Sequence, residues 1–448
     1  MAKRLNILFI SNFPPSHSAG LARDYMHALE IAGHHVDYLT KYDYPGRKDN
    51  EYFVLKPKTW MKIREWSLRH SFVYRLIHRF HVGAKLNKKE SIKLRNESNG
   101  LMITNLYEDK PPVDISLVLK SIHKSYDVVL TLFWQEFITT VTLKAIYDKL
   151  KCPIIIRSVD MFTYTGGCFY FGECRNFMKG CGKCPVLSST DSNDQTHKNF
   201  LIKKEVYSSM NYAIGLNSWM QQFAKPTGLF AEDRIVTTSA SIDETLFIPK
   251  EKVVCKRHFG IEENKFVLFS RAAGKGNVAK GFEYLIMAVN SFAESLDEKQ
   301  RKNVVLALAG RELTQEEKSE FKVDVVNLGM LSREDLIAAY NAGAAFLSPS
   351  IDDAGPSMVN QSIMCGTPVV CFDIGTAWDV IFNGKSGYKV ESKDTKAFGH
   401  AIETIHAMSD AQYLELQKST REIALKYNSL KAFSDMVENT YQMLKNKE

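Results

Sequence analysis

The sequence predicts an α/β protein made of two Rossmann-like domains, each a doubly wound parallel sheet, and three observations carry this prediction. The chain has 448 residues, which exceeds one ordinary hydrophobic core and suits two domains of roughly 200 residues each. Its hydrophobic content of 45% is sufficient to fill both cores. Short apolar runs alternate with segments of helical spacing, and the alternation starts again after Pro249.

The first half opens with a strand, a loop and a helix. Residues 5–11, LNILFIS, form an apolar run, and the helical pattern that follows stops at Gly33 before a second strand at residues 36–40. A helix is expected over residues 136–150, between strands at residues 126–133 and 152–160. This order is typical of a parallel sheet with crossover helices.

The second half repeats the pattern. A helix is expected over residues 281–296, and strands are expected in KFVLFS, NVVLALAG, VDVVNLG, AAFLSPS and TPVVCFD. The polar, proline-containing stretch SASIDETLFIPK has the composition of a linker. We therefore divide the chain into an N-terminal domain (1–238), a linker (239–262), a C-terminal domain (263–428) and a final amphipathic helix (429–448).

The net charge of +7 is concentrated in one insertion of the first domain, residues 56–95. This segment holds twelve Lys or Arg against two Glu, so the rest of the chain is slightly acidic. Its apolar residues, Trp66 and Phe80 among them, have helical spacing, which fits either an anionic membrane surface or a helix packed on its own domain. No nucleic-acid motif accompanies the charge, so nucleic acid is not expected as a partner.

The N-terminus does not have the pattern of a secretory signal. The apolar run after Lys3 and Arg4 covers only Leu5 to Ile10, and no apolar segment approaches the ~18 residues that cross a bilayer. We expect a cytoplasmic protein, peripheral on the inner face of the cell membrane if the basic insertion docks there.

Four of the eight cysteines lie within seventeen residues: Cys168, Cys174, Cys181 and Cys184. Clustered thiols in a chain without a secretory signal indicate metal more than disulfides. The turn GCGKCP places two thiols around a glycine, which suits a tetrahedral zinc knuckle. A closed structural zinc site is one expectation, and unligated or redox-labile thiols are the alternative.

The stretch PSIDDAGPSMVNQSIMCGTPVV, residues 349–370, is the first candidate for chemistry. It follows a predicted strand, and ligands of parallel sheets bind past the carboxyl ends of the strands. A helix is expected from Pro356 to Cys365, and its N-terminus offers free amide donors to an anionic or hydroxylated ligand. Gln361 and Asp353 could bind sugar or ribose hydroxyls. In the alternative, Asp352, Asp353 and Gln361 are solvated surface residues.

Several segments together resemble the retaining GT-B glycosyltransferases of family four. They are NILFISNFPP with its later AG and GHHV, LALAG, NLGMLSREDLIAAYNAGAAFLSPS and MCGTPVVCFDIG. The resemblance covers nearly the whole chain, and the order and spacing of the segments are more specific than any one of them. It implies two domains facing across a cleft and transfer of a sugar from a nucleotide diphosphate sugar, such as a UDP- or GDP-sugar.

The resemblance also implies roles for individual residues. Asp353 and Gln361 stand where the family has two glutamates that hold the donor sugar and the ribose, so Asp353 is the catalytic candidate. Arg271 and Lys280 match the diphosphate clamp, with Lys275 as a competing cation. The remaining donor-side candidates are Gly20, Gly329, Leu331, Ser350, Gly355 and Ser357.

Three positions depart from the family pattern. Asp353 is one methylene shorter than Glu, Gln361 has no charge, and Val159 stands where the family often has a histidine before Asp160. Asp160 is the acceptor-side candidate. The cysteine segment resembles a loop found in a subset that includes colanic-acid and exopolysaccharide enzymes, and it would form a wall of the acceptor site.

The chain contains no Asp-x-Asp, so we expect no metal cofactor in catalysis. The predicted function is a glycosyltransferase acting on a glycan or lipid-linked acceptor in surface polysaccharide synthesis. One rival is a non-catalytic GT-B protein that binds a sugar nucleotide or glycan, which the three departures favour. A dinucleotide-dependent oxidoreductase is the other, but SNFPPSHSAG lacks the Gly-x-Gly-x-x-Gly turn.

Overall fold

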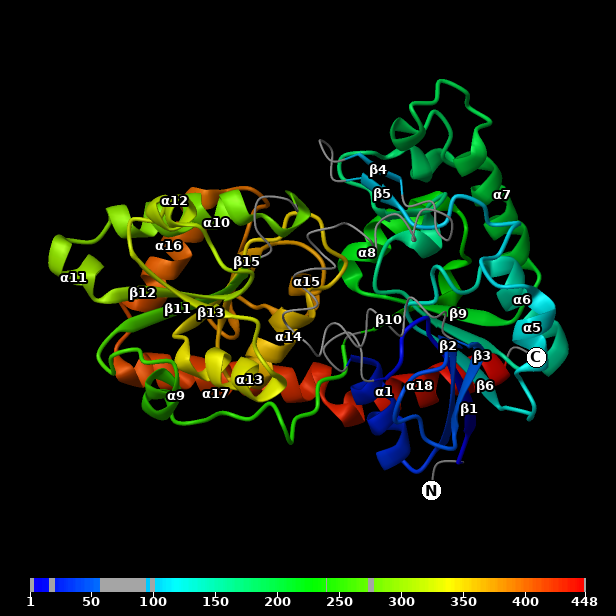
Figure 1. The fold of residues 1–448 in the computed structure, drawn as a ribbon, viewed down its shortest axis with the longest axis horizontal. Helices are drawn as coiled ribbons and strands as arrows, with labels where there is room; N and C mark the ends of the chain where they lie inside the picture. Colours follow the sequence, from blue (N-terminus) through cyan, green and yellow to red (C-terminus); the bar gives the residue numbers. More distant parts are fainter. Residues whose placement is uncertain are drawn as a thin grey trace. The chain divides into compact units, whose positions relative to one another are not determined.

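The computed structural model (Figure 1) describes residues 4–15, 21–56, 94–96, 101–238, 240–272 and 278–446. The chain divides into two compact units. Unit 1 comprises Met1–Gly215, Phe223–Val236 and Val437–Glu448, and unit 2 comprises Leu216–Gln222 and Thr237–Met436. Over the described residues, unit 1 has a seven-stranded sheet and unit 2 a six-stranded one. The predicted class, an α/β protein with two Rossmann-like domains, is confirmed.

The strand order of the unit 1 sheet is β10-β9-β7-β6-β1-β2-β3, and the pairs from β9 to β3 are parallel. Every residue of β6 and β7 is buried, which explains the three consecutive apolar residues that begin each strand. The strands are β1 (Asn6–Ile10), β2 (His35–Tyr42), β3 (Glu51–Leu55), β6 (Val128–Thr131), β7 (Ile154–Arg157), β9 (Tyr212–Leu216) and β10 (Ile235–Thr237).

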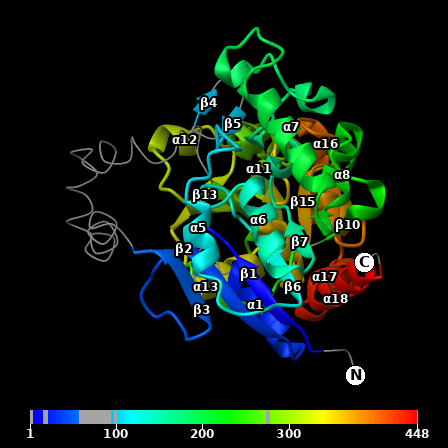
Figure 2. The ribbon, with the colours of Figure 1, turned by 90° about the vertical axis from the view of Figure 1, so that its right-hand side faces the viewer.

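The helices of this part of the chain begin at polar caps. In α6, Thr139 and Thr142 form a reciprocal capping box, so the helix starts four residues after the predicted Glu136. Figure 2 shows α5 beside α6. The helices are α1 (Leu21–Ile31), α5 (Ile115–Lys120), α6 (Thr140–Leu150), α7 (Gln195–Ser208) and α8 (Ser218–Ala224), with 3-10 turns η6 (Lys225–Thr227) and η7 (Glu232–Arg234).

A small antiparallel sheet carries the cysteine segment. Its strands have the order β4-β5-β8, and β8 begins at Cys168. The elements are β4 (Leu94–Asn96), β5 (Leu101–Ile103), η3 (Phe162–Tyr164), β8 (Cys168–Tyr170), η4 (Asn176–Lys179) and η5 (Pro185–Leu187).

The described strands of the unit 2 sheet have the order β13-β12-β11-β14-β15-β16, and all neighbours pair in parallel. Chain order therefore reverses at β11, which has β12 on one side and β14 on the other. The strands are β11 (Phe266–Ala272), β12 (Val304–Gly310), β13 (Asp324–Gly329), β14 (Ala345–Ser348), β15 (Val369–Phe372) and β16 (Gly387–Val390).

Helices cover both faces of this sheet (Figure 1). The helices α10 and α16 pack on one face, and α13 and α14 pack on the other. The helices are α9 (Lys252–His258), η8 (Val278–Lys280), α10 (Phe282–Glu294), α11 (Glu298–Lys302), α12 (Gln315–Ser319), α13 (Arg333–Ala342), α14 (Ser357–Met364), α15 (Ala377–Val380), α16 (Thr395–His406) and α17 (Asp410–Asn428). The segment expected to be a linker (239–262) contains α9, so it is partly helical. It belongs to unit 2.

The last helix, α18 (Leu430–Lys445), returns the chain to unit 1. Glu438 lies 3.0 Å from the ring of the buried His34, and Asn211 donates a hydrogen bond of 3.2 Å to the carbonyl of Leu444. Among the described helices, none has the length and apolar character needed to span a membrane.

Candidate functional site

The candidate site lies in unit 2 at the carboxyl end of its sheet, where chain order reverses. Arg271 is near the end of β11, and Ser350 follows the neighbouring strand β14. Ligands of open parallel sheets bind at such a switch point because the loops there diverge to opposite faces. The topology therefore brings together two segments that are almost eighty residues apart in sequence.

The loop that carries Lys280 is tied to the loop after β14. The carbonyl of Ala279 accepts a hydrogen bond of 2.9 Å from the amide of Ile351. Gly281 has a φ of +69°, and a Cβ atom built on it would lie 1.8 Å from the carbonyl oxygen of Pro349. Only glycine fits this approach, so Gly281 sets how closely the lysine loop meets the acidic loop.

Lys280 and Asp353 form an ion pair at this junction. The other carboxylate oxygen of Asp353 accepts a hydrogen bond of 3.1 Å from the amide of Gly355. The Asp353 side chain is 10% exposed, whereas the Lys280 side chain is 24% exposed. The ammonium group is thus accessible to an incoming anion, and a phosphate would compete with Asp353 for it.

Gln361 is buried in α14 and contacts Tyr340 of α13. Its Oε1 accepts a hydrogen bond of 3.0 Å from the Tyr340 hydroxyl. Burial raises the pKa of Tyr340 above its usual range, and the charge and side-chain hydrogen bond of Arg271 partly offset that rise. The Tyr340 hydroxyl gives its proton to Oε1 of Gln361, so the NH₂ group of Gln361 points away from Tyr340.

The alternative in which Asp352, Asp353 and Gln361 are solvated surface residues is wrong. Both aspartates are 7% exposed and Gln361 is 3% exposed. The physical reason is that Val359 and Ile363 pack into the core, so helix α14 packs closely against Tyr340. Polar groups in this position are held by the fold and do not face bulk water.

The other donor-side candidates lie along the same edge of the sheet. Gly329 ends β13 with a φ of +64°, and Leu331 packs against the core beneath α13. Ser350 is 3% exposed, and Ser357 is the first residue of α14. Because β13 is two strands from β11, Gly329 and Leu331 are separated from the cationic side chains of Arg271 and Lys280. An extended ligand could place one end at each position.

Asp160 lies in unit 1 after β7 and is 1% exposed. Its carboxylate accepts a hydrogen bond of 2.8 Å from the amide of Phe162 and another from the side chain of Gln135. Burial raises its pKa to about 6, against the lowering effect of these hydrogen bonds and of the Lys203 charge. Val159, which precedes it, is partly exposed.

Three expectations fall outside the described residues. They concern Gly20, Lys275 and the basic insertion 56–95, of which only Lys56 and residues 94–95 are described. Sequence reasoning also missed two residues of the sites. Tyr340 had a usable signal, because a tyrosine inside a buried helix needs a partner for its hydroxyl. Gln135 had none, since its contact with Asp160 depends on the pairing of β6 with β7.

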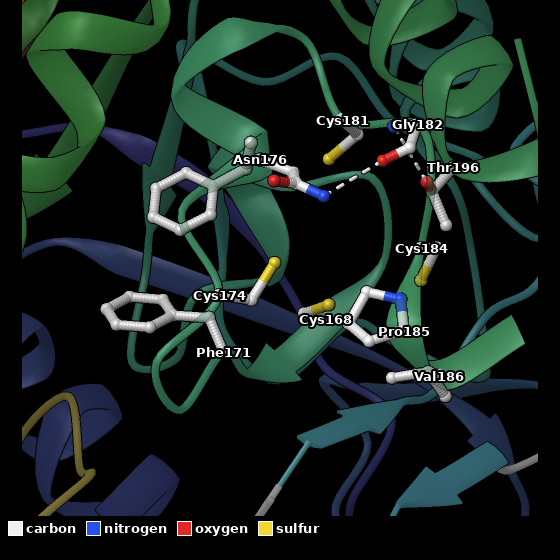
Figure 3. A pocket seen from close by; sticks show the side chains of 11 residues that line it. Cys168, Phe171, Cys174, Asn176, Cys181, Gly182, Cys184, Pro185, Val186 and Thr196 are labelled. Carbon is white, nitrogen blue, oxygen red and sulfur yellow. Dashed lines mark hydrogen bonds between the residues drawn. The ribbon is translucent and has the colours of Figure 1, made fainter. Parts of the chain in front are cut away.

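The four clustered cysteines surround one small cavity (Figure 3). All four are free thiols, and burial raises the pKa of Cys181 to about 12. Across the described ranges, no group of three or more His, Cys, Asp or Glu side chains is arranged to hold a metal ion as it stands.

The comparisons with known proteins cover the region that contains the candidate site. Residues 256–426 match the family described as Glycosyl transferases group 1. An uncharacterized glycosyltransferase of Methanocaldococcus jannaschii is 24% identical over 188 residues, which are 40% of this chain and 45% of that protein. A D-inositol 3-phosphate glycosyltransferase of Pseudarthrobacter chlorophenolicus is 24% identical over 181 residues, 39% and 42% of the two chains. The chain thus matches less than half the length of these relatives.

Solved structures resemble the chain over its full length. Sucrose-phosphate synthase from Thermosynechococcus elongatus has a TM-score of 0.61 at 15% identity, covering 99% of this chain and 100% of that one. Anabaena HepE, solved with UDP and glucose, has a TM-score of 0.61 at 13% identity, covering 98% and 100%. At these identities the likeness shows the fold, which is that of the GT-B glycosyltransferases.

Proposed function

We propose that this protein is a glycosyltransferase that takes a sugar from a nucleotide diphosphate sugar. The observations that carry the proposal are the Lys280–Asp353 ion pair and the Tyr340–Gln361 hydrogen bond, both in the part of unit 2 that matches the glycosyl transferase family. Bound UDP in the similar Anabaena structure supports a nucleotide donor.

The chemistry follows from the charges. Transfer of the sugar leaves negative charge on the departing nucleoside diphosphate, and fixed cations stabilise that charge as it develops. Lys280 supplies an ammonium group on a partly exposed side chain, and Arg271 supplies a guanidinium near Tyr340. In this proposal the leaving phosphate displaces Asp353 from Lys280, and the released carboxylate binds a hydroxyl of the donor sugar.

The finer features of the proposal rest on the sequence resemblance. They are membership of family four, retention at the anomeric carbon, catalysis without a metal ion, and a glycan or lipid-linked acceptor of surface polysaccharide synthesis. Asp160 belongs to the acceptor side. The basic insertion would hold the protein on an anionic membrane surface, where a lipid-linked acceptor lies.

The test is an assay of the purified full-length chain against a panel of UDP- and GDP-sugars. Binding is measured by thermal shift, because a ligand that binds only the folded state raises the melting temperature. Turnover is measured as release of UDP or GDP with and without added glycan acceptors, in the presence and absence of EDTA. Donor turnover that persists in EDTA supports the proposal.

A non-catalytic GT-B protein is the second candidate, favoured by the Asp353, Gln361 and Val159 substitutions. It predicts a thermal shift with UDP or GDP and no release of nucleotide from any donor. Absence of both binding and turnover across the panel would contradict both candidates.

A further inference from the structure

We infer that Cys168, Cys174, Cys181 and Cys184 hold one structural zinc ion. This inference does not rest on the proposed transfer reaction. Cys168 begins β8 and Cys174 lies in the turn after it, whereas Cys181 follows η4 and Cys184 directly precedes η5; all four line the same cavity (Figure 3).

The size and lining of the cavity fit a single ion. Its volume is about 20 Å³, close to the minimum that holds one water molecule. Most of the remaining wall is apolar, with Phe171, Phe177 and Pro185 among its residues. The side-chain amide of Asn176, which lines the cavity, donates a hydrogen bond of 3.1 Å to the carbonyl of Gly182. A lone water would therefore find few partners there, whereas a thiophilic cation would find four sulfurs.

A backbone amide is already directed at one of the sulfurs. The amide of Gly166 donates a hydrogen bond of 3.2 Å to the Sγ of Cys181. An amide donor stabilises a thiolate far more than a thiol. Such donors to ligand sulfurs are the outer partners that tune metal sites.

The turn between the last two cysteines is wound into an unusual conformation. Gly180, Cys181, Gly182 and Lys183 are consecutive and have φ values of +93°, +61°, +89° and +47°. Left-handed backbone is unfavourable at the two residues that are not glycine. A Cβ on Gly182 would lie 2.2 Å from the carbonyl oxygen of Ser192, so the turn cannot relax outward. A metal ion that binds both flanking thiolates would account for this strained backbone.

Buried polar residues fix the surroundings of the cavity. The carboxylate of Asp194 accepts a hydrogen bond of 2.8 Å from the amide of Cys184, and the ring of His197 lies 2.7 Å from the carbonyl of Gly180. The ammonium of Lys203 is fully buried. Its positive charge would offset part of the net charge of −2 on a tetrathiolate zinc centre.

Binding exchanges four thiol protons for one Zn²⁺, so the centre is a tetrathiolate and four protons are released. The thiols surround the cavity without yet forming a ligand set, so the sulfurs must turn inward to about 2.3 Å from the metal. With four protein ligands no position remains for a substrate. The role is structural: the ion holds the segment between β8 and η5. The chain between Asp160 and β8 is held by Lys203, which donates hydrogen bonds to the carbonyls of Phe162 and Thr165.

The test is metal analysis of the full-length chain purified without chelator. We expect about one zinc per chain, and after exchange with Co²⁺ the intense visible bands of tetrahedral cobalt thiolate. Cys174→Ser and Cys184→Ser should reduce zinc to a small fraction of that amount. Cys255→Ser is the matched control, because Cys255 is a buried free cysteine of α9 outside the loop, and it should retain the metal.

Readouts on the wild-type chain keep the inference testable if the serine variants fail to fold. Stripping the zinc should lower the melting temperature and expose four thiols to alkylation, and zinc should restore both. Three results would overturn the inference: four thiols that alkylate in the native, untreated protein, a mass deficit that shows disulfides, or zinc retained by both loop variants.

Discussion

The hydroxyl of Tyr340 donates a 3.0 Å hydrogen bond to Oε1 of Gln361, and both side chains are buried between α13 and α14. The positive charge of Arg271 lies near the same hydroxyl and lowers the pKa of Tyr340 against the effect of burial. This chain of contacts connects the end of β11 to α14, and it fixes the orientation of the Gln361 amide. In the proposed function, the Gln361 NH₂ group is then the part that a ribose hydroxyl meets.

Tyr340→Phe should weaken UDP or GDP binding. The substitution leaves Gln361 free to rotate, and we expect a loss of about 1 kcal/mol, or roughly fivefold in affinity, as measured by calorimetric titration. The control is Tyr413→Phe, which also removes a tyrosine hydroxyl. That part-buried hydroxyl donates a hydrogen bond of 2.8 Å to the carbonyl of Ala344. Equal affinity losses in the two variants would mean that Tyr340 acts through stability alone.

Lys280→Ala should weaken binding of the nucleoside diphosphate without affecting the nucleoside. A hydrogen bond to a charged group contributes about 2 kcal/mol, so UDP or GDP affinity should fall roughly 30-fold. Titration of the diphosphate and of the nucleoside on the same variant separates the two effects.

Lys322→Ala is the matched control, because Lys322 forms an exposed ion pair with Glu294, at 2.5 Å, and is outside the site. It should bind both ligands as the wild type does. Parallel losses of diphosphate and nucleoside affinity in Lys280→Ala would remove the lysine from the phosphate site.

Gly281→Ala should destabilise unit 2 strongly. The new Cβ meets the carbonyl oxygen of Pro349 at 1.8 Å in a left-handed backbone conformation, and the expected loss in free energy of unfolding is about 3 kcal/mol or more. Urea unfolding measures it.

The comparison variant is Gly260→Ala, since Gly260 has a similar φ of +67° with open space around it. It should cost only the conformational strain of about 1 kcal/mol. If both alanine variants unfold at the same urea concentration, the close packing of the lysine loop on Pro349 is wrong.

The buried carboxyl of Asp160 should make stability depend on pH. Its pKa is about 6 in the folded protein and 3.8 in the reference state, so the proton is bound more tightly after folding. The resulting stabilisation is complete below pH 3.8 and is lost as the pH rises through about 6. Between pH 5 and pH 8 the wild type should lose about 1.4 kcal/mol from this residue.

Asp160→Asn keeps the hydrogen-bond acceptor and removes the titration. The difference in unfolding free energy between pH 5 and pH 8 should therefore be smaller in the variant by about the same 1.4 kcal/mol. Urea unfolding at the two pH values supplies the four numbers needed, and other titrating groups cancel in the double difference. An unchanged pH dependence would show that Asp160 is not buried as described.

The sequence by itself determined the class of fold. Apolar runs such as NILFI and VVLALAG have the composition of strands buried on both faces, and they alternate with helices whose caps are encoded locally, as at Ser332 of α13. Such signals depend only on neighbouring residues in the chain, so they can be read without knowledge of the fold. They also identified Asp353, Gln361 and the four cysteines as candidates.

Only the tertiary structure decided how these residues meet. The reversal of strand order at β11 sets Arg271 near Tyr340, and the Ala279 to Ile351 hydrogen bond brings Lys280 to Asp353. The same long-range packing buries Gln361, for which sequence spacing alone left a solvated position open. Contacts between residues tens of positions apart depend on sheet order and helix packing, and no local pattern of side chains records them.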